Sequence, residues 1–278
     1  MNLRNSQSSP QKVSDNRPDT RFHADKMVVP VERFVAWVDI MGMVNKMSRS
    51  LFQSANFIGK FHIVCEWAAT KNNGTYFPVM DGAFAVFETA SATRRFFDDA
   101  FAVVADSFCR EHDNEHRYLV RAGVSHGNVY LPGHFTEKVS KEFSKIAAQA
   151  NILMGFPVIQ AHLVEGKAPP FGVYVHEAAR GCLGKNEKPK EAFAGAWYHW
   201  RVDEDQRKRL VKCGAAYFTW CRNHSEETDY PIDAINQHER VFKSFFSSRI
   251  KCKTKSIGRI SRLVHKIVSI VIGRFREP

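Results

Sequence analysis

The fold is decided by the stretch Arg33-Phe-Val-Ala-Trp-Val-Asp39-Ile40-Met-Gly42-Met43. Its β-branched and aromatic residues predict a strand over residues 31–40 that ends close to a carboxylate. Apolar residues then recur at helical spacing, which predicts one long helix over residues 43–70. The stretch therefore brings Asp39 to the end of a strand, three residues before a glycine and the start of a helix.

A second stretch, Tyr76-Phe-Pro-Val-Met-Asp81-Gly82-Ala-Phe-Ala-Val-Phe87, joins two short apolar runs through an Asp-Gly pair. Asp-Gly between apolar runs predicts a hairpin, here over residues 75–88. An acid at the end of one strand and another in an adjacent hairpin turn can share one edge of a sheet. Two carboxylates there, with backbone carbonyls nearby, suit a hard divalent cation that also binds phosphate oxygens. The simpler alternative is that Asp39 only ends a strand and caps a helix, while Asp81 only favours the turn.

The rest of the chain continues this alternation of helices and strands. Helices are predicted over residues 91–112, 136–150, 155–165, 205–222 and 230–248. Strands are predicted over residues 116–130 and 171–176 and at Trp197-Tyr198-His199-Trp200. The order βαββαβ, then αβ, predicts an α+β fold. We expect a ferredoxin-like mixed sheet with helices on one face, plus a C-terminal helical extension.

Positive charge is concentrated near the C-terminus. The net charge is +11, and residues 243–278 hold ten Lys or Arg against one acid, Glu277. We therefore expect a flexible leader over residues 1–28, a main domain over 29–180, its completion over 181–248, and a basic amphipathic segment over 249–278. The last segment is interpreted first as a helix packed on the domain, then as a membrane-surface or partner helix, and third as a nucleic-acid contact. No motif specific for nucleic acid is present.

Composition excludes several classes of protein. Hydrophobic residues make up 44% and charged residues 25% of the chain, as in soluble globular domains. The six cysteines include no Cys-X-X-Cys and no close pair, so neither a disulfide framework nor a zinc site is expected. Free thiols favour a reducing compartment, the cytoplasm. The first residues do not form a signal peptide, and no apolar run is long enough to span a bilayer.

Four stretches, in this order, resemble the class III nucleotide cyclase homology domain, and more narrowly the pyrimidine cyclases of the bacterial Pycsar anti-phage systems. The resemblance covers about residues 31–178. The stretches are Phe34-Val-Ala-Trp-Val-Asp39-Ile40-Met-Gly42, Met80-Asp81-Gly82-Ala-Phe-Ala-Val-Phe87, Val120-Arg121-Ala-Gly123-Val-Ser-His-Gly127, and Gly155-Phe-Pro-Val-Ile-Gln-Ala161-His-Leu-Val-Glu165 followed by Pro170-Phe-Gly-Val-Tyr-Val175.

The resemblance implies that residues 29–180 form a nucleotide cyclase domain. In that family, aspartates at the positions of Asp39 and Asp81, joined by the main-chain carbonyl at the Ile40 position, hold two divalent ions, Mn²⁺ or Mg²⁺. Backbone N–H groups around Gly42 and Met43 would bind the triphosphate, as helix starts bind anions. Further implied contacts, each with a structural alternative, are the phosphate-binding position at Arg121 (otherwise a surface ion pair) and base contacts at Trp37 and Phe77 (otherwise core residues).

The resemblance also bears on the base. Purine cyclases carry a base-reading Lys and Asp where this sequence has Phe77 and Ile152, and an Asn and an Arg where it has Ile159 and Leu163. Their absence argues against ATP and GTP and fits the pyrimidine group. The expected reaction converts UTP, or with less support CTP, to its 3′,5′-cyclic monophosphate and pyrophosphate. Two metals suffice for such phosphoryl transfer, and no dedicated general base is expected.

The resemblance further implies a homodimer with active sites built across the interface. The product would be an anti-phage signal read by a separate cyclic-nucleotide effector protein. Two other functions stay open. One is a catalytically inactive, nucleotide-binding sensor of the cyclase type, against which the presence of both Asp39 and Asp81 argues. The other is a basic nucleic-acid-binding protein.

Overall fold

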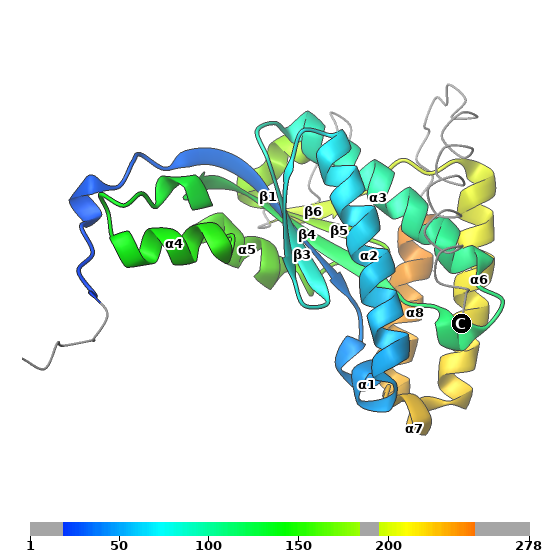
Figure 1. Ribbon diagram of the computed structural model, residues 1–278. Helices are drawn as coiled ribbons and strands as arrows, with labels where there is room; N and C mark the ends of the chain where they lie inside the picture. The colour runs from blue at the N-terminus through cyan, green and yellow to red at the C-terminus, as the bar shows by residue number, and fades with distance from the viewer. Residues whose placement is uncertain (1–18, 184–194, 248–278) are drawn as a thin grey trace, which may run out of the picture. The chain divides into compact units, whose positions relative to one another are not determined.

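The computed structural model describes residues 19–183 and 195–247 (Figure 1). These residues fall into two compact units. The smaller unit contains residues 19–29 and 130–152, and the larger unit contains the other described residues, from 30–129 and from 153 onward. The predicted basic segment over 249–278 and most of the predicted leader lie outside the described residues.

A six-stranded mixed sheet forms the centre of the larger unit, with strand order β2-β3-β1-β4-β5-β6. The β4–β5 pair is parallel, and every other pair is antiparallel. Strands β1 to β4 alone have the order of a ferredoxin-like sheet. The strands are β1 (Val31–Ile40), β2 (Thr75–Val79), β3 (Gly82–Phe87), β4 (Val120–Val129), β5 (Val173–His176) and β6 (Gly195–Tyr198).

Helices follow the strands in the predicted order. Those of the larger unit are α1 (Met43–Arg49), α2 (Leu51–Lys71), α3 (Ala90–Arg110), α5 (Phe156–Glu165), α6 (Glu204–Asn223), α7 (Ser225–Thr228) and α8 (Ile232–Ser247). The prediction of one helix over residues 43–70 was wrong, because Ser50 has extended backbone angles. Its side chain instead accepts a hydrogen bond from the Gln53 N–H and caps α2. A serine at this position stabilises a helix start better than a helix interior.

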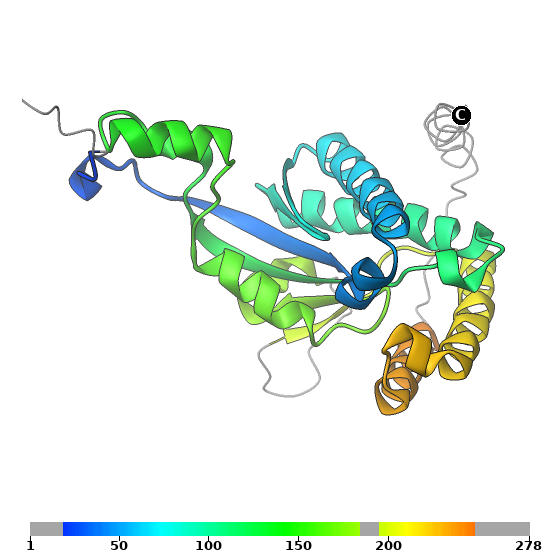
Figure 2. The ribbon, with the colours of Figure 1, turned by 60° about the horizontal axis from the view of Figure 1, so that its bottom comes forward.

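Helices cover both faces of the sheet. Alternate residues of β1, β3 and β4 contribute to one large core with α2 and α3. The residues between them face α5, since a Cβ on Gly123 of β4 would meet the Ala161 carbonyl oxygen of α5 at 2.1 Å. Figure 2 shows α5 on the side of the sheet opposite α2 and α3. The predicted α+β mixed sheet is thus confirmed, whereas the expectation that helices lie on one face holds for α2 and α3 but not for α5.

The C-terminal helices pack on the end of α3 and complete the aromatic core. Phe242 of α8 lies 5.7 Å from Phe218 of α6 and 6.4 Å from Phe171, measured between ring centroids. The Trp200 indole N–H donates to the Phe171 carbonyl at 2.7 Å. All four side chains are almost completely buried, so α6 and α8 are part of the larger unit's core.

The smaller unit has its own aromatic cluster. Phe143 of α4 (Lys141–Gln149) lies 5.2 Å from Phe135 and 5.7 Å from Phe22, again between ring centroids. The His23 N–H donates to the Val139 carbonyl at 2.8 Å, which joins residues 19–29 to the segment that contains α4. Residues at the end of the predicted leader therefore have defined partners.

The β2–β3 hairpin forms where it was predicted, with a different turn. Val79 pairs with Gly82, so the two turn residues are Met80 and Asp81 rather than Asp81 and Gly82. Met80 has φ +50°, a left-handed conformation that costs a side chain about 1 kcal/mol or more. The turn holds the Asp81 backbone beside the end of β1.

Among the described residues, no helix is both long enough and apolar enough to cross a membrane.

We expect Gly123→Ala to destabilise the larger unit, because the new methyl would meet the Ala161 carbonyl oxygen at 2.1 Å and the Glu165 nitrogen at 2.8 Å. The free energy of unfolding in urea should fall by about 1–3 kcal/mol or more. Gly59→Ala is the matched control. Gly59 lies inside α2, and a Cβ there would meet nothing within 4 Å. The free energy of unfolding of this variant should therefore rise by about 0.5–1 kcal/mol. Equal stability of the two variants would contradict the close contact between β4 and α5.

Candidate functional site

The two predicted acids lie at one end of the central strands. Asp39 is the second-last residue of β1, and its Cα lies opposite Gly82, the first residue of β3. Asp81 precedes Gly82 in the turn, and its carbonyl accepts a hydrogen bond from the Ile40 N–H at 3.2 Å. Backbone pairing therefore fixes both acids beside one another, as the sequence predicted.

Gly82 permits this close approach. A Cβ at this position would lie 2.4 Å from the indole ring of Trp37 and 3.1 Å from Oδ1 of Asp39. No side-chain atom fits between the two strands there. The glycine of the Asp-Gly pair is therefore required by the packing of the site and does not form the turn itself.

A basic residue faces Asp39 from the other neighbouring strand. The Cα of Arg121 on β4 lies opposite that of Asp39, and the Arg121 Nε donates to the Glu165 carboxylate at the end of α5. The Glu165 side chain is buried and that of Arg121 is 24% exposed, so the pair is half-buried. Of the two interpretations weighed for Arg121, an ion pair is present. Its partner, Glu165, is a buried acid.

Negative charge accumulates around Asp39. Its pKa is raised to about 7, mainly by burial and further by the charges of Glu165 and Asp81, while Arg121 acts in the opposite direction. Burial also raises the pKa of Glu165, against the effect of Arg121. Carboxylates that raise the pKa of a neighbouring buried acid in this way favour a bound cation.

A histidine that the sequence did not single out holds the turn. The ring of His62 on α2 hydrogen-bonds through Nε2 to the Met80 carbonyl at 2.7 Å and through Nδ1 to the Tyr76 hydroxyl at 2.5 Å. Since a carbonyl only accepts, Nε2 carries the hydrogen, and the Tyr76 hydroxyl donates to Nδ1 in the neutral ring. The left-handed Met80 is thereby fixed to α2. No local pattern marks His62, because its partners are 14 and 18 residues away.

Three other candidate residues, Ile40, Gly42 and Met43, lie where β1 ends and α1 begins. Ile40 and Met43 point into the core and are 1% exposed, so only their backbone atoms can meet a ligand. Gly42 has φ +72°, which turns the chain from β1 into α1, and it lines a cavity of about 180 Å³ together with Arg121.

The two aromatic candidates are buried. Trp37 is 6% exposed and packs against Phe84 and His162, with ring centroids 4.5 and 5.2 Å apart. Phe77, 4% exposed, pairs with Phe84 on the same face of the sheet. Burial of this extent is what the core alternative predicts for both residues, while base contacts at Trp37 and Phe77 stay a prediction.

The donor set fits a divalent cation only in part. Two carboxylates and the Ile40 carbonyl are oxygen donors of the kind that Mn²⁺ and Mg²⁺ prefer. Among the described residues, no group of three or more His, Cys, Asp or Glu side chains could hold a metal. A metal at Asp39 and Asp81 would therefore depend on water or on a bound phosphate for its remaining ligands, as is usual for Mg²⁺.

Comparisons with known proteins give structural similarity without a family. No protein-family model and no curated protein matches the chain. The monomeric guanylyl cyclase domain of the RhoGC fusion protein from the aquatic fungus Blastocladiella emersonii is similar to 55% of this chain over 85% of its own length, with 14% identity and a TM-score of 0.44. An adenylate/guanylate cyclase/hydrolase from Silicibacter pomeroyi has 17% identity and a TM-score of 0.43, over 54% of this chain and 78% of its own.

A third similar structure is the guanylate cyclase domain of RhGC from Catenaria anguillulae in complex with GTP, with 14% identity and a TM-score of 0.42, over 54% of this chain and 81% of its own. These identities and TM-scores are too low to assign a family or an activity. The function of this chain is therefore inferred from its own residues.

The raised pKa of Asp39 predicts a pH dependence of stability in the absence of divalent cations. Its pKa in the folded chain, about 7, lies above the usual value of 3.8, so the protonated form stabilises the fold. That contribution is complete below pH 4 and is lost as the pH rises through 7. Urea unfolding in EDTA should show wild type losing on the order of 1–3 kcal/mol relative to Asp39→Asn between pH 4 and pH 8. A constant difference between the two proteins would show that Asp39 is an ordinary solvated acid.

Proposed function

We propose that the chain is a nucleotide cyclase that converts a pyrimidine nucleoside triphosphate, UTP in preference to CTP, to its 3′,5′-cyclic monophosphate and pyrophosphate. The observation that carries the proposal is the pair formed by Asp39 and Asp81. Strand pairing places the two acids side by side, and Arg121 lies on the next strand. Two acids with an adjacent cation suit a substrate that brings both phosphate and metal.

In the proposed reaction the ribose 3′-oxygen bonds to the α-phosphorus, and the bond from that phosphorus to the bridging oxygen breaks. Pyrophosphate leaves with the electron pair of that bond, and the hydroxyl proton passes to solvent. In phosphoryl transfer of this kind the protein mainly positions the reacting groups and neutralises the charge of the phosphates. The chain is suited to this because backbone pairing holds both acids and Arg121 at fixed positions.

Asp39, Asp81 and the Ile40 carbonyl would hold two Mn²⁺ or Mg²⁺ ions. When bound, these ions neutralise charge on the phosphates and activate the attacking oxygen. Arg121 would bind a phosphate once its guanidinium turns from Glu165, with which it is paired here. The pKa of Asp39, about 7, would fall beside a cation, so the acid would bind metal in its ionised form.

Pyrimidine specificity is proposed on what the site lacks. The positions at which purine cyclases read the base by hydrogen bonds are apolar here. Phe77 is buried, while Ile159 and Leu163 are 55% and 68% exposed on α5. None of these side chains can donate to or accept from a purine. The further proposals, a cytoplasmic enzyme whose product signals phage infection to a separate effector, rest on the sequence resemblance alone.

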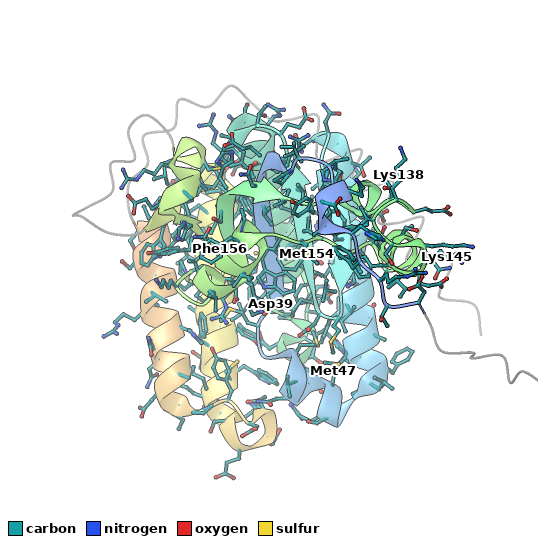
Figure 3. The ribbon with its side chains drawn as sticks, turned by 90° about the vertical axis from the view of Figure 1, so that its left-hand side faces the viewer. Asp39, Met47, Lys138, Lys145, Met154 and Phe156 are labelled. Carbon is teal, nitrogen blue, oxygen red and sulfur yellow. The ribbon has the colours of Figure 1, made fainter. Side chains whose placement is uncertain are left out.

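A homodimer is proposed through the exposed face of α5. Phe156, Ile159 and Leu163 recur at helical spacing on this helix and are 69%, 55% and 68% exposed. A contiguous apolar face of this kind marks an interaction surface. Figure 3 shows Met154 and Phe156 near the start of α5. The other end of the helix, with Leu163, leads to Glu165, which pairs with Arg121 opposite Asp39, so a partner docked along α5 would extend to the acids.

The reaction is tested by mass spectrometry of the purified full chain incubated with all four nucleoside triphosphates and Mn²⁺. Wild type should yield a cyclic pyrimidine monophosphate. Asp81→Ala and Asp39→Asn should reduce its formation by about 10³-fold or more, because each removes a charge that would hold the metals. Glu137→Ala, an exposed acid in the smaller unit, is the matched control and should leave the rate unchanged.

The other outcomes separate the alternatives. Formation of cyclic AMP or cyclic GMP instead would support a nucleotide cyclase but overturn the assignment of a pyrimidine substrate. Nucleotide binding without any cyclic product would favour the inactive sensor. Absence of both would overturn the proposed function.

The dimer is tested by light scattering at several protein concentrations. Leu163→Glu should weaken self-association by about a hundredfold, since a two-fold interface buries the same substitution twice. Ile232→Glu is the control, because Ile232 of α8 is also exposed, at 51%, yet lies on another helix. Dimers of equal stability in both variants would exclude α5 as the interface.

A further inference from the structure

The C-terminal helices close one side of a cavity next to the acid pair. The cavity has a volume of about 180 Å³ and begins at Met41 and Gly42, directly after the end of β1. Its remaining lining residues come from α1 and the start of α2 (Asn45, Lys46, Arg49, Gln53), from the segment before β4 and β4 itself (Glu115, Leu119, Arg121), from α6 (Tyr217, Trp220, Cys221), and from α7 to α8 (Thr228, Asp229, Tyr230, His238).

Hydrogen bonds hold these walls together. The Asn45 side-chain amide of α1 donates to the Asp229 carbonyl at 2.7 Å, which ties α1 to the turn between α7 and α8. Tyr230, in the same turn, hydrogen-bonds to the His238 ring of α8. The cavity is thus enclosed by parts of the chain that lie far apart in the sequence, and all of them belong to the larger unit.

Lys46 is a partly buried cation of the lining. Its ammonium donates to the Arg117 carbonyl at 3.0 Å and lies 4.9 Å from the centroid of the Phe57 ring. Among the described residues this carbonyl is its one hydrogen-bond acceptor, although an ammonium has three N–H donors. Burial lowers the pKa of Lys46 to about 8, so the group is still mostly charged at neutral pH. A partly desolvated cation with unused donors is stabilised by an anion.

The other charged residues of the lining are the cations Arg49 and Arg121 and the acids Glu115 and Asp229, and Arg121 is already paired with Glu165 outside the lining. No ion pair of Arg49 occurs among the described residues. Burial and the nearby Arg121 both lower the pKa of His238, which disfavours its charged form.

The positions of these cations favour an extended anion over a single carboxylate. Lys46 and Arg49 lie on α1, whereas Arg121 lies on β4, where it faces both the cavity and Asp39. A ligand that reaches all three cations must extend from the acid pair into the cavity. Guanidinium and ammonium groups together are the usual partners of linked phosphate groups.

We propose that this cavity binds a polyphosphate group, with Lys46 as its central cation and with α6, the α7–α8 turn and α8 as its walls. The inference gives the C-terminal helices a role in ligand binding. It rests on the proposed function only for the source of the ligand, which is either the terminal phosphates of the bound nucleotide or a free polyphosphate.

The binding test uses the purified full chain without metal and inorganic pyrophosphate as the probe, measured by isothermal titration calorimetry. Wild type should bind pyrophosphate, and Lys46→Met should bind it at least about tenfold more weakly, as expected for the loss of a hydrogen bond between charged groups. Arg49→Gln changes an exposed side chain and should also weaken binding, which covers the case in which Lys46→Met fails to fold. Lys212→Met removes an exposed cation of α6 outside the cavity and should bind like wild type.

Three results would overturn the proposal: no binding by wild type, unchanged binding in both Lys46→Met and Arg49→Gln, or equal losses in Lys46→Met and Lys212→Met.

A competition experiment identifies the source of the ligand. If UTP displaces pyrophosphate, the cavity takes the nucleotide's own phosphates; if both bind at once, it takes a free polyphosphate. Pyrophosphate binding without a cyclic product would contradict the proposed function alone, and a cyclic product without pyrophosphate binding would contradict this inference alone.

Discussion

The antiparallel pairing of β1 with β3 on one side and with β4 on the other fixes the site. In this register Asp39 faces Gly82 and Arg121 at the level where the hairpin turn brings in Asp81. Side chains alternate between the two faces of a strand, so a slip of one residue would turn Asp39 into the core with Phe96 and Phe101. The core prevents that slip, because Ala36, Val38 and Ile40 must all face α2 and α3. Burial of apolar residues on one face therefore determines where the charged residues lie on the other.

The charged face combines one guanidinium with a cluster of carboxylates. Arg121 lies between the carboxylates of Asp39 and Glu165, and it lines the cavity that also contains Lys46 and Arg49. With no cation bound, burial and, to a smaller extent, the charges of Glu165 and Asp81 favour the protonated form of Asp39 and raise its pKa to about 7. One guanidinium is thus shared by an acid cluster and a basic cavity. Binding of a cation on one side and of an anion on the other would relieve both imbalances.

Local patterns in the sequence were sufficient to predict the sheet and the acid pair. The apolar run that ends at Asp39 and the Asp-Gly hairpin each identify their own element, and the order of elements gives the ferredoxin-like arrangement. Other features depend on contacts between distant residues. The Arg121–Glu165 pair joins residues 44 positions apart, and Lys46 meets the C-terminal helices only through tertiary packing. The break at Ser50 was missed because apolar spacing continues through it, whereas the capping hydrogen bond to Gln53 determines where α2 begins.

The site contains four charged residues, Asp39, Asp81, Arg121 and Glu165. Each is about forty residues from the next along the chain. Three of them meet through strand pairing, and the fourth arrives only when α5 has packed on β4. Each closure of such a loop costs entropy that is regained only when the sheet is complete. We therefore expect the site to be among the last parts of the larger unit to form during folding. A chain proteolysed before α5 docks would keep the three charges that strand pairing joins, and it would lack the Glu165 carboxylate that pairs with Arg121.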